Sequence, residues 1–155
     1  MKSSHVGRDG SIAMVDVSRK PVSSRVARAE ALVRMSPAAQ RALRSATLSK
    51  GDALVAAQLA GIMAAKQTAS LIPLTHPLPL SCVDVRFDWH EDLLRVEAEA
   101  RTTAQTGVEM EAMVAAAIAA LTIYDMSKSL DKGIAIEGIR LLRKSGGKSG
   151  LWVRK

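Results

Sequence analysis

The sequence predicts an α+β fold of the ferredoxin-like type, a βαββαβ sandwich in which helices pack on one face of an antiparallel sheet. Segments at 25–35 and 82–90 alternate apolar and polar residues, as half-buried strands do. Segments at 53–69 and 108–130 are long and rich in alanine, which is typical of helices. The main elements follow the order strand, helix, strand, strand, helix, strand, which is that of the split βαβ motif.

The first strand, at 25–35, is expected to bury one face. The residues expected to face the core are Ala27, Ala29, Ala31, Val33 and Met35, with Arg28, Glu30 and Arg34 mostly on the other face. Ser36 as N-cap and Pro37 at the first helical position then open a short helix that runs to about residue 45.

The first main helix, at 53–69, begins after Asp52, whose carboxylate can cap it. Its large apolar residues are expected to share one face, with Gly61 allowing close packing; they are Leu54, Leu59, Ile62 and Met63. The helix is expected to end before Pro73.

The second half of the chain begins with a hairpin. Strands at 82–90 and 93–104 are joined by a tight turn at Glu91 and Asp92, and the first strand directs inward Val83, Val85, Phe87 and Trp89. A long helix follows at 108–130 and ends near Gly133. A last strand from residue 134 leads into a flexible glycine-lysine loop and a short end at 151–155.

The length of 155 residues fits one domain, so we expect a mobile tail at 1–13 and a single catalytic domain at 14–155. Cys82 is the only cysteine, which rules out an intrachain disulfide and favours the cytoplasm. The N-terminus lacks the apolar core of a signal peptide, and the apolar stretch at 112–124 is expected to be too short for a bilayer. We therefore expect no membrane partner.

A net charge of +7 has three explanations: solubility, attraction to nucleic acid, or attraction to a small polyanion such as a nucleotide phosphate. Proteins that bind single strands stack bases on aromatic rings, and this chain has few; they are Phe87, Trp89, Tyr124 and Trp152. Composition therefore argues against a nucleic-acid partner.

The stretch LIPLTHPLPL at 71–80 holds His76 among prolines, which exclude both a helix interior and a central strand. A side chain on such a stiff loop keeps its position, and an imidazole can transfer a proton or hold a phosphate. The alternative is a histidine that is satisfied by backbone groups in a packed loop.

Carboxylates mark both ends of the long helix. Glu109 and Glu111 lie in its first turn, where they offset the helix dipole, and a rotation of about 200° between them argues against a paired dyad. Near the other end, Asp125 and Lys128 are neighbours on one face, either as a simple ion pair or as functional groups. Glu111 and Asp125 are about 21 Å apart along the helix, so one reaction that uses both needs two chains.

The stretch KSGGKSG at 144–150 matches only the end of the phosphate loop GxxxxGK[ST]. Gly147, Lys148 and Ser149 fit, but the required first glycine falls on Leu142 and no helix-length segment follows. Glycines beside lysines can still offer amide and ammonium groups to an anion.

Seven blocks in the chain resemble one known family. They are MVDVS at 14–18, KGD at 50–52, AGIMAAK at 60–66, LIPLTHPL at 71–78, TGVEMEAM at 106–113, ALTIYDMSK at 120–128 and RLLRKSGGKSG at 140–150. Together they closely resemble the molybdenum cofactor biosynthesis protein C family, the cyclic pyranopterin monophosphate synthases, from about Met14 to Gly150.

The resemblance implies a ferredoxin-like subunit in a homo-hexamer, a trimer of dimers, with active sites at the dimer interface. It implies a lyase that turns a cyclised dihydro-GTP into cyclic pyranopterin monophosphate and releases pyrophosphate. The sequence calls for no redox cofactor and has no dedicated metal-ligand cluster, although the chemistry leaves room for Mg²⁺ on the leaving pyrophosphate.

The resemblance also implies site residues. Asp125 and Lys128 are the implied catalytic pair, and the implied substrate-binding residues are Leu74, Thr75, His76, Glu109, Met110, Glu111, Lys50, Lys66 and Lys144. Lys148 and one of Arg25 and Arg28 are further candidates. Thr75 stands where the family often has cysteine, and Ser127 where some members have it, so the chemistry is expected to need no thiol at either position.

Overall fold

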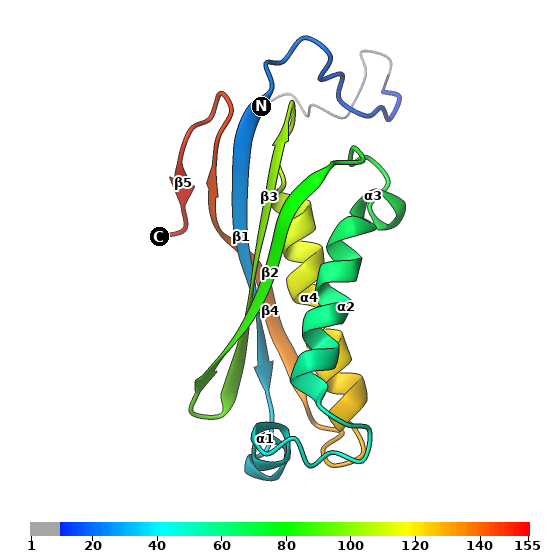
Figure 1. Cartoon of the computed structure of the whole chain (residues 1–155), viewed down its shortest axis with the longest axis vertical. Coiled ribbons are helices and arrows are strands. Elements are labelled where there is room, and N and C mark those ends of the chain that lie inside the picture. Colours follow the sequence, from blue (N-terminus) through cyan, green and yellow to red (C-terminus); the bar gives the residue numbers. More distant parts are fainter. Residues whose placement is uncertain (1–9) are drawn as a thin grey trace.

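A computed structural model describes residues 10–155, and residues 1–9 of the predicted tail lie outside the described residues. Five strands form one sheet, antiparallel throughout, in the order β2-β3-β1-β4-β5 (Figure 1). The strands are β1 (Ser23–Arg34), β2 (Leu80–His90), β3 (Leu93–Ala104), β4 (Ala135–Ser145) and β5 (Trp152–Val153). The helices are α1 (Pro37–Arg44), α2 (Ala53–Lys66), α3 (Thr68–Leu71) and α4 (Glu109–Ser127). The predicted α+β, ferredoxin-like fold is confirmed, with β5 added at one edge.

Helices α2 and α4 cover one face of the sheet (Figure 1), and the core lies between them and the strands. The alternation predicted for β1 is confirmed, because Ala27, Ala29, Ala31 and Val33 are at most 1% exposed. Gly61 is needed where α2 crosses α4, since a Cβ there would lie 2.9 Å from the Ala115 carbonyl oxygen. Small side chains thus let the helices pack closely.

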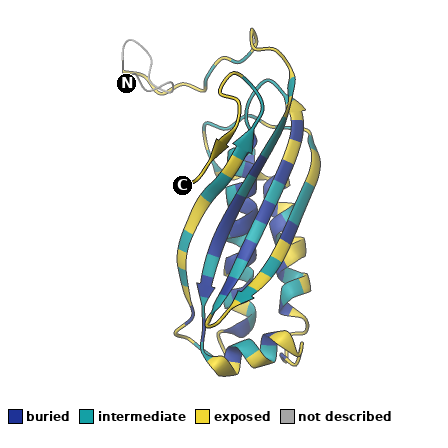
Figure 2. Cartoon of the chain, turned by 90° about the vertical axis from the view of Figure 1, so that its left-hand side faces the viewer, coloured by how far each residue is buried: buried dark blue, intermediate teal, exposed yellow. Residues whose placement is uncertain are grey.

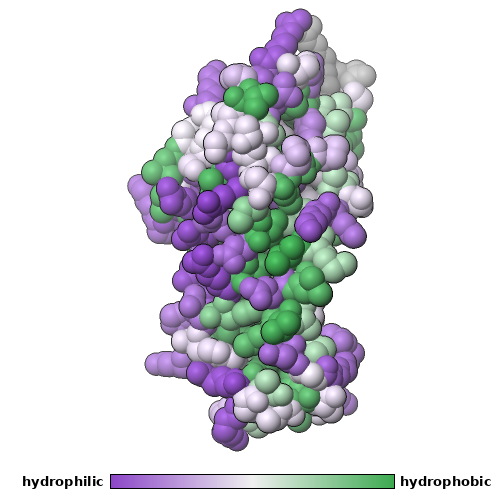
Figure 3. Space-filling model, in the orientation of Figure 1, coloured by the Kyte–Doolittle hydropathy of each residue, from purple (hydrophilic) through white to green (hydrophobic). Residues whose placement is uncertain are grey.

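The predicted inward face of α2 is half wrong. Leu54 and Ile62 pack against the core, but the side of α2 that is buried carries Ala57, Gly61 and Ala64. Because α4 approaches this small-residue side, larger side chains turn outward, and Val55, Leu59 and Met63 are 51–60% exposed. In Figure 3, hydrophobic residues form a strip along this side of the molecule.

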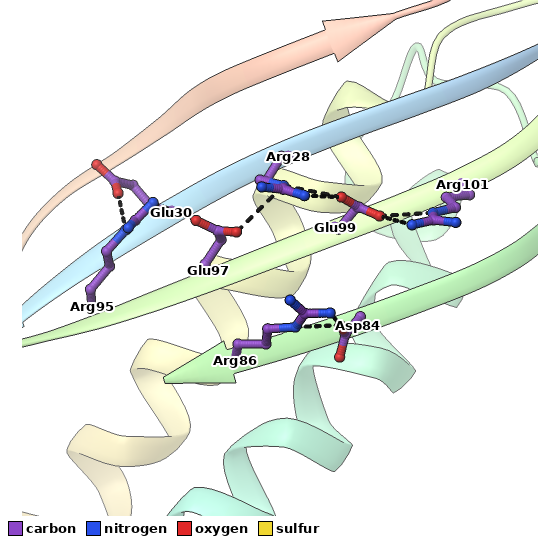
Figure 4. A network of polar contacts seen from close by, with 8 residues as sticks. All are labelled: Arg28, Glu30, Asp84, Arg86, Arg95, Glu97, Glu99 and Arg101. Atoms are coloured by element: carbon purple, nitrogen blue, oxygen red, sulfur yellow. Dashed lines mark hydrogen bonds and ion pairs between the residues drawn. The ribbon is translucent and has the colours of Figure 1, made fainter. Parts of the chain in front are cut away.

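The other face of the sheet carries charged side chains and is not covered by α2 or α4 (Figure 2). Arginine, glutamate and aspartate side chains from β1, β2 and β3 alternate across it (Figure 4). Glu30 lies on this face as predicted, but it is buried there: it is 5% exposed, between Arg95 and Arg140, each at 2.6 Å. These two partners offset the cost of burying its carboxylate.

Helix α4 is the one helix within residues 10–155 that could cross a membrane by length and composition. The prediction of an apolar stretch too short for this is wrong, because α4 runs for 19 residues. Its contacts decide its role, since Ala112, Ala116 and Ile123 are fully buried against the sheet and α2. It is the central helix of the core.

Candidate active site

Two adjoining cavities open near the N-terminal end of α4. The first, which we name the histidine cavity, has about 510 Å³ and is lined by Val15, Lys20, Leu74, Thr75, His76, Leu78, Thr106, Gly107, Glu109, Met110, Glu111 and Lys144. The second, the basic cavity, has about 910 Å³ and includes Arg19, Lys20, Arg25, Lys144 and Lys148 in its lining. Lys20, Glu109 and Lys144 border both, so the cavities form one continuous recess.

The proline loop places His76 on the wall of the histidine cavity. Thr75 also lines this cavity, and its hydroxyl donates to the Ile72 carbonyl at 2.9 Å. The His76 ring lies 2.9 Å, through Nε2, from the Val15 carbonyl oxygen. A carbonyl can only accept, so Nε2 carries the hydrogen. The histidine is therefore satisfied by a backbone group, but that group belongs to a segment 61 residues away that borders the same cavity.

The first turn of α4 supplies two carboxyl groups with different surroundings. Glu109 reaches Lys144 Nζ at 2.8 Å, and both side chains are about a third exposed or less. Glu111 is 3% exposed. Burial, aided by the nearby charge of Glu109, raises the pKa of Glu111 to about 7. Glu109 and Glu111 border the same cavity, although the helical rotation between them suggested that they would face different sides. Of the two, only Glu109 has an ion-pair partner.

Arg25 and a glycine turn form part of the wall of the basic cavity. Arg25 donates from Nε to the Ala104 carbonyl at 2.9 Å and from Nη2 to that of Gln105 at 3.0 Å. Gly146 and Gly147 have positive φ, and a Cβ on either would overlap Ser24 or Arg25. The KSGGKSG stretch is thus pressed against β1 beside the cavity. Arg28, the alternative candidate, lies on the charged face of the sheet and pairs with Glu99 at 2.6 Å.

The predicted catalytic pair lies at the opposite end of α4. Asp125 contacts Lys128 at 2.7 Å and Lys50 at 3.0 Å, and Lys50 also donates to the Asp125 carbonyl at 2.9 Å. The side chain of Asp125 is 57% exposed. Hydrogen bonds from Lys128 and then Lys50 hold the pKa of Asp125 below its usual value. This lysine pair keeps Asp125 ionised.

The predicted site residues therefore fall into two groups within one chain. Leu74, Thr75, His76, Glu109, Met110, Glu111 and Lys144 meet at the recess, and Lys50, Asp125 and Lys128 meet at the far end. Lys66, the last residue of α2, is exposed and does not border either cavity.

Sequence reasoning missed the residues that reach the recess from the N-terminal segment, chiefly Val15 and Lys20. The MVDVS block, which contains Val15, and the Arg19–Lys20 pair before Pro21 were the available signals. Among residues 10–155, no three histidine, cysteine or acidic side chains gather as a metal site would require.

Comparison with known proteins identifies the family. The MoaC family model matches residues 14–147, which is most of the chain. The chain belongs to the MoaC family. Three relatives, each named cyclic pyranopterin monophosphate synthase, match over nearly their whole length. The protein of Syntrophomonas wolfei is 51% identical over 99% of both chains, that of Oleidesulfovibrio alaskensis 57% over 95% of this chain and 94% of its own, and that of Corynebacterium glutamicum strain R 53% over 97% of both.

Membership of the MoaC family confirms the resemblance read from the seven sequence blocks. The matched range begins at Met14, so it includes the N-terminal segment that reaches the recess, and it ends at Gly147, within the glycine turn. Both cavities and the Asp125 cluster thus lie mainly on residues that the family model covers.

Proposed function

We propose that the chain is a cyclic pyranopterin monophosphate synthase of molybdenum cofactor biosynthesis. It converts the cyclised dihydro-GTP into cyclic pyranopterin monophosphate and releases pyrophosphate. The observation that carries this proposal is the 51–57% identity, over nearly the full chain, to relatives of that name. The structure adds a recess whose charge and size suit a nucleotide-derived triphosphate.

The recess supports the proposal through its basic side chains. Lys20 and Lys144 border both cavities, and Arg19 and Lys148 border the basic cavity. Ammonium and guanidinium groups stabilise phosphate oxygens and the charge that develops on a leaving pyrophosphate. We assign the phosphate chain to the basic cavity and the ring system to the histidine cavity, whose wall includes Leu74, Leu78 and Met110.

The two carboxyl groups divide the proton transfers. Opening the purine-derived ring, closing the pterin and forming the cyclic phosphate all require proton movement. Glu111, with its pKa raised to about 7, can hold a proton at neutral pH and act as an acid. Asp125, with its pKa lowered by Lys128 and Lys50, stays ionised and acts as a base.

A complete site then needs two subunits, because Asp125 lies far from Glu111 in one chain. We assign the dimer contact to the exposed side of α2, the helix that packs along α4; this side carries Val55, Leu59 and Met63. Figure 3 shows a hydrophobic strip on this side of the molecule. An antiparallel pairing of this side about a two-fold axis brings the partner's end of α4 toward the recess. Three such dimers make the expected homo-hexamer, a soluble assembly of the cytoplasm.

The proposed reaction uses no redox cofactor. Mg²⁺, if bound, would neutralise charge on the leaving pyrophosphate. Within residues 10–155, no three histidine, cysteine or acidic side chains gather to hold it. Chelation by EDTA tests this, with a several-fold fall in rate, reversed by added Mg²⁺, as the expected result.

The test is turnover of the cyclised dihydro-GTP by the purified chain. Pyrophosphate is measured by a coupled phosphate assay, and the product by mass after oxidation to a fluorescent pterin. GTP is the matched substrate control and should release no pyrophosphate. A folded wild-type chain that releases no pyrophosphate from the cyclised substrate would refute the assignment.

A further inference from the structure

The chain segment that crosses the recess is residues 15–20, here named the N-terminal strap. It precedes β1 and runs across the end of the molecule where the recess lies (Figure 1). Val15 and Lys20 line the histidine cavity, and Arg19 and Lys20 line the basic cavity. The strap thus supplies part of the wall of both cavities although it is neither strand nor helix.

Two side chains from elsewhere hold the strap through its carbonyl groups. His76, on the proline loop, bonds the Val15 carbonyl at 2.9 Å. Gln105, just after β3, donates from Nε2 to the Ser18 carbonyl at 3.2 Å. The end of the strap is also folded by its own turn, in which the Lys20 amide donates to the Val17 carbonyl at 2.9 Å.

The strap has little apolar packing. Its two valines, Val15 and Val17, are only half-buried, and its other side chains are exposed; they are Asp16, Ser18, Arg19 and Lys20. Segments with few buried apolar contacts open at low free energy, so polar contacts decide how long such a segment stays closed. The ring of His76, fixed between prolines, is the better placed of the two contacts.

The bond to Val15 also limits what His76 can do while the strap is closed. Its Nε2–H is engaged, so that nitrogen cannot take a proton from the substrate. We propose that His76 is a positioning residue that latches the strap over the recess and thereby brings Lys20 to the phosphate groups. The substrate part of this inference rests on the proposed function, whereas the latch itself does not.

The latch can be tested without turnover. Trypsin can cut after Arg19, whereas the bond after Lys20 is protected by Pro21, so the fragment that begins at Lys20 reports strap opening. Loss of one hydrogen bond of about 1 kcal/mol should raise this cleavage rate about fivefold in His76→Ala. Gln105→Ala should raise it less. His90→Ala, at an exposed hairpin position, is the matched control and should leave the rate unchanged.

Turnover separates a latch from a proton-transfer group. The amide of His76→Gln can still donate to a carbonyl but cannot transfer a proton. A latch predicts that His76→Gln keeps kcat within about threefold of wild type, while His76→Ala raises KM by up to about fivefold through loss of the Lys20 contact. A proton-transfer role predicts that both variants lower kcat by about a hundredfold or more.

Thermal unfolding confirms that each variant is folded before either assay. Unchanged cleavage after Arg19 in folded His76→Ala would overturn the latch, whatever the chain's activity. Faster cleavage together with no turnover by wild type would leave the latch standing and refute the proposed function instead.

Discussion

The two ends of α4 carry the same kinds of side chain in opposite surroundings. At the N-terminal end, Glu111 is 3% exposed and burial raises its pKa to about 7. At the C-terminal end, Asp125 is 57% exposed, and Lys128 and Lys50 lower its pKa. The helix dipole alone would favour a carboxylate at the first end and disfavour it at the second.

This contrast shows that local environment, more than residue type or helix position, sets what each carboxyl group can do. Desolvation outweighs the dipole at Glu111, and two ammonium groups outweigh it at Asp125. One group can hold a proton near neutral pH and the other stays ionised, which is the division that acid–base catalysis needs. Because about 21 Å of helix separates them, the division is useful only across a subunit interface.

The largest expected effect comes from two variants, each with a substitution at a different end of α4. Glu111→Ala and Asp125→Ala should each be nearly inactive alone. Mixing the two after unfolding and refolding together should restore about a quarter of wild-type activity, because half of the dimers are mixed and each mixed dimer has one intact site. Pyrophosphate release by the mixture measures this.

The control for mixing is the same procedure with each variant alone, which should stay inactive. Native mass spectrometry establishes that mixed oligomers have formed. No recovery in verified mixed oligomers would mean that the two ends of α4 do not share a site.

The sequence predicted both ends of α4, but not how they differ. Alternating residues in β1 and the alanine-rich helices gave the sheet and its covered face, because strand and helix periodicities are local properties. The outward turn of Leu59 and Met63 could not be predicted, since it depends on how closely α4 approaches α2 at Gly61. The burial of Glu30 likewise requires β3 and β4 beside β1.

The site was predictable where a motif fixed it, and not where distant segments meet. The resemblance to the family gave His76 and Lys144, which line the recess. It gave no sign that the strap reaches His76, because the contact joins residues 61 positions apart. The pKa of Glu111 was equally hidden, since desolvation is a property of the packed chain.

The next largest expected effect is that of Glu111→Gln on the pH dependence of stability. Its pKa is about 7 when folded, against a usual 4.5, so its protonated form stabilises the fold fully below about pH 4.5, and this contribution is lost as pH rises to about 7. Glu111→Gln does not lose stability in this way, because an amide does not titrate. Relative to wild type, the variant should gain on the order of 3 kcal/mol in free energy of unfolding between these limits.

Urea unfolding at several pH values measures this difference, and Glu109→Gln is the matched control from the same turn. The control should show no comparable gain, because Glu111 is still present and its burial, the main cause of its raised pKa, is unchanged. In turnover, wild type should show a fall in kcat above about pH 7, and Glu111→Gln should be slow and should lack this fall. A pH-independent stability difference would contradict the buried, proton-holding Glu111.

The smallest expected effect concerns the lysines at the other end. Lys128 contributes most to the lowered pKa of Asp125 and Lys50 comes next, so Lys128→Met should raise that pKa more than Lys50→Met does. Neither change should move the thermal midpoint measurably, since the three side chains are exposed. Carbon NMR of the Asp125 carboxyl group follows the titration directly, and the acid limb of kcat should shift upward in the same order.

The matched control is Lys132→Met, which changes an exposed lysine just beyond α4. Equal titration of Asp125 in all three variants would show that the lysines do not hold it ionised, and the contrast between the two ends would then rest on burial alone.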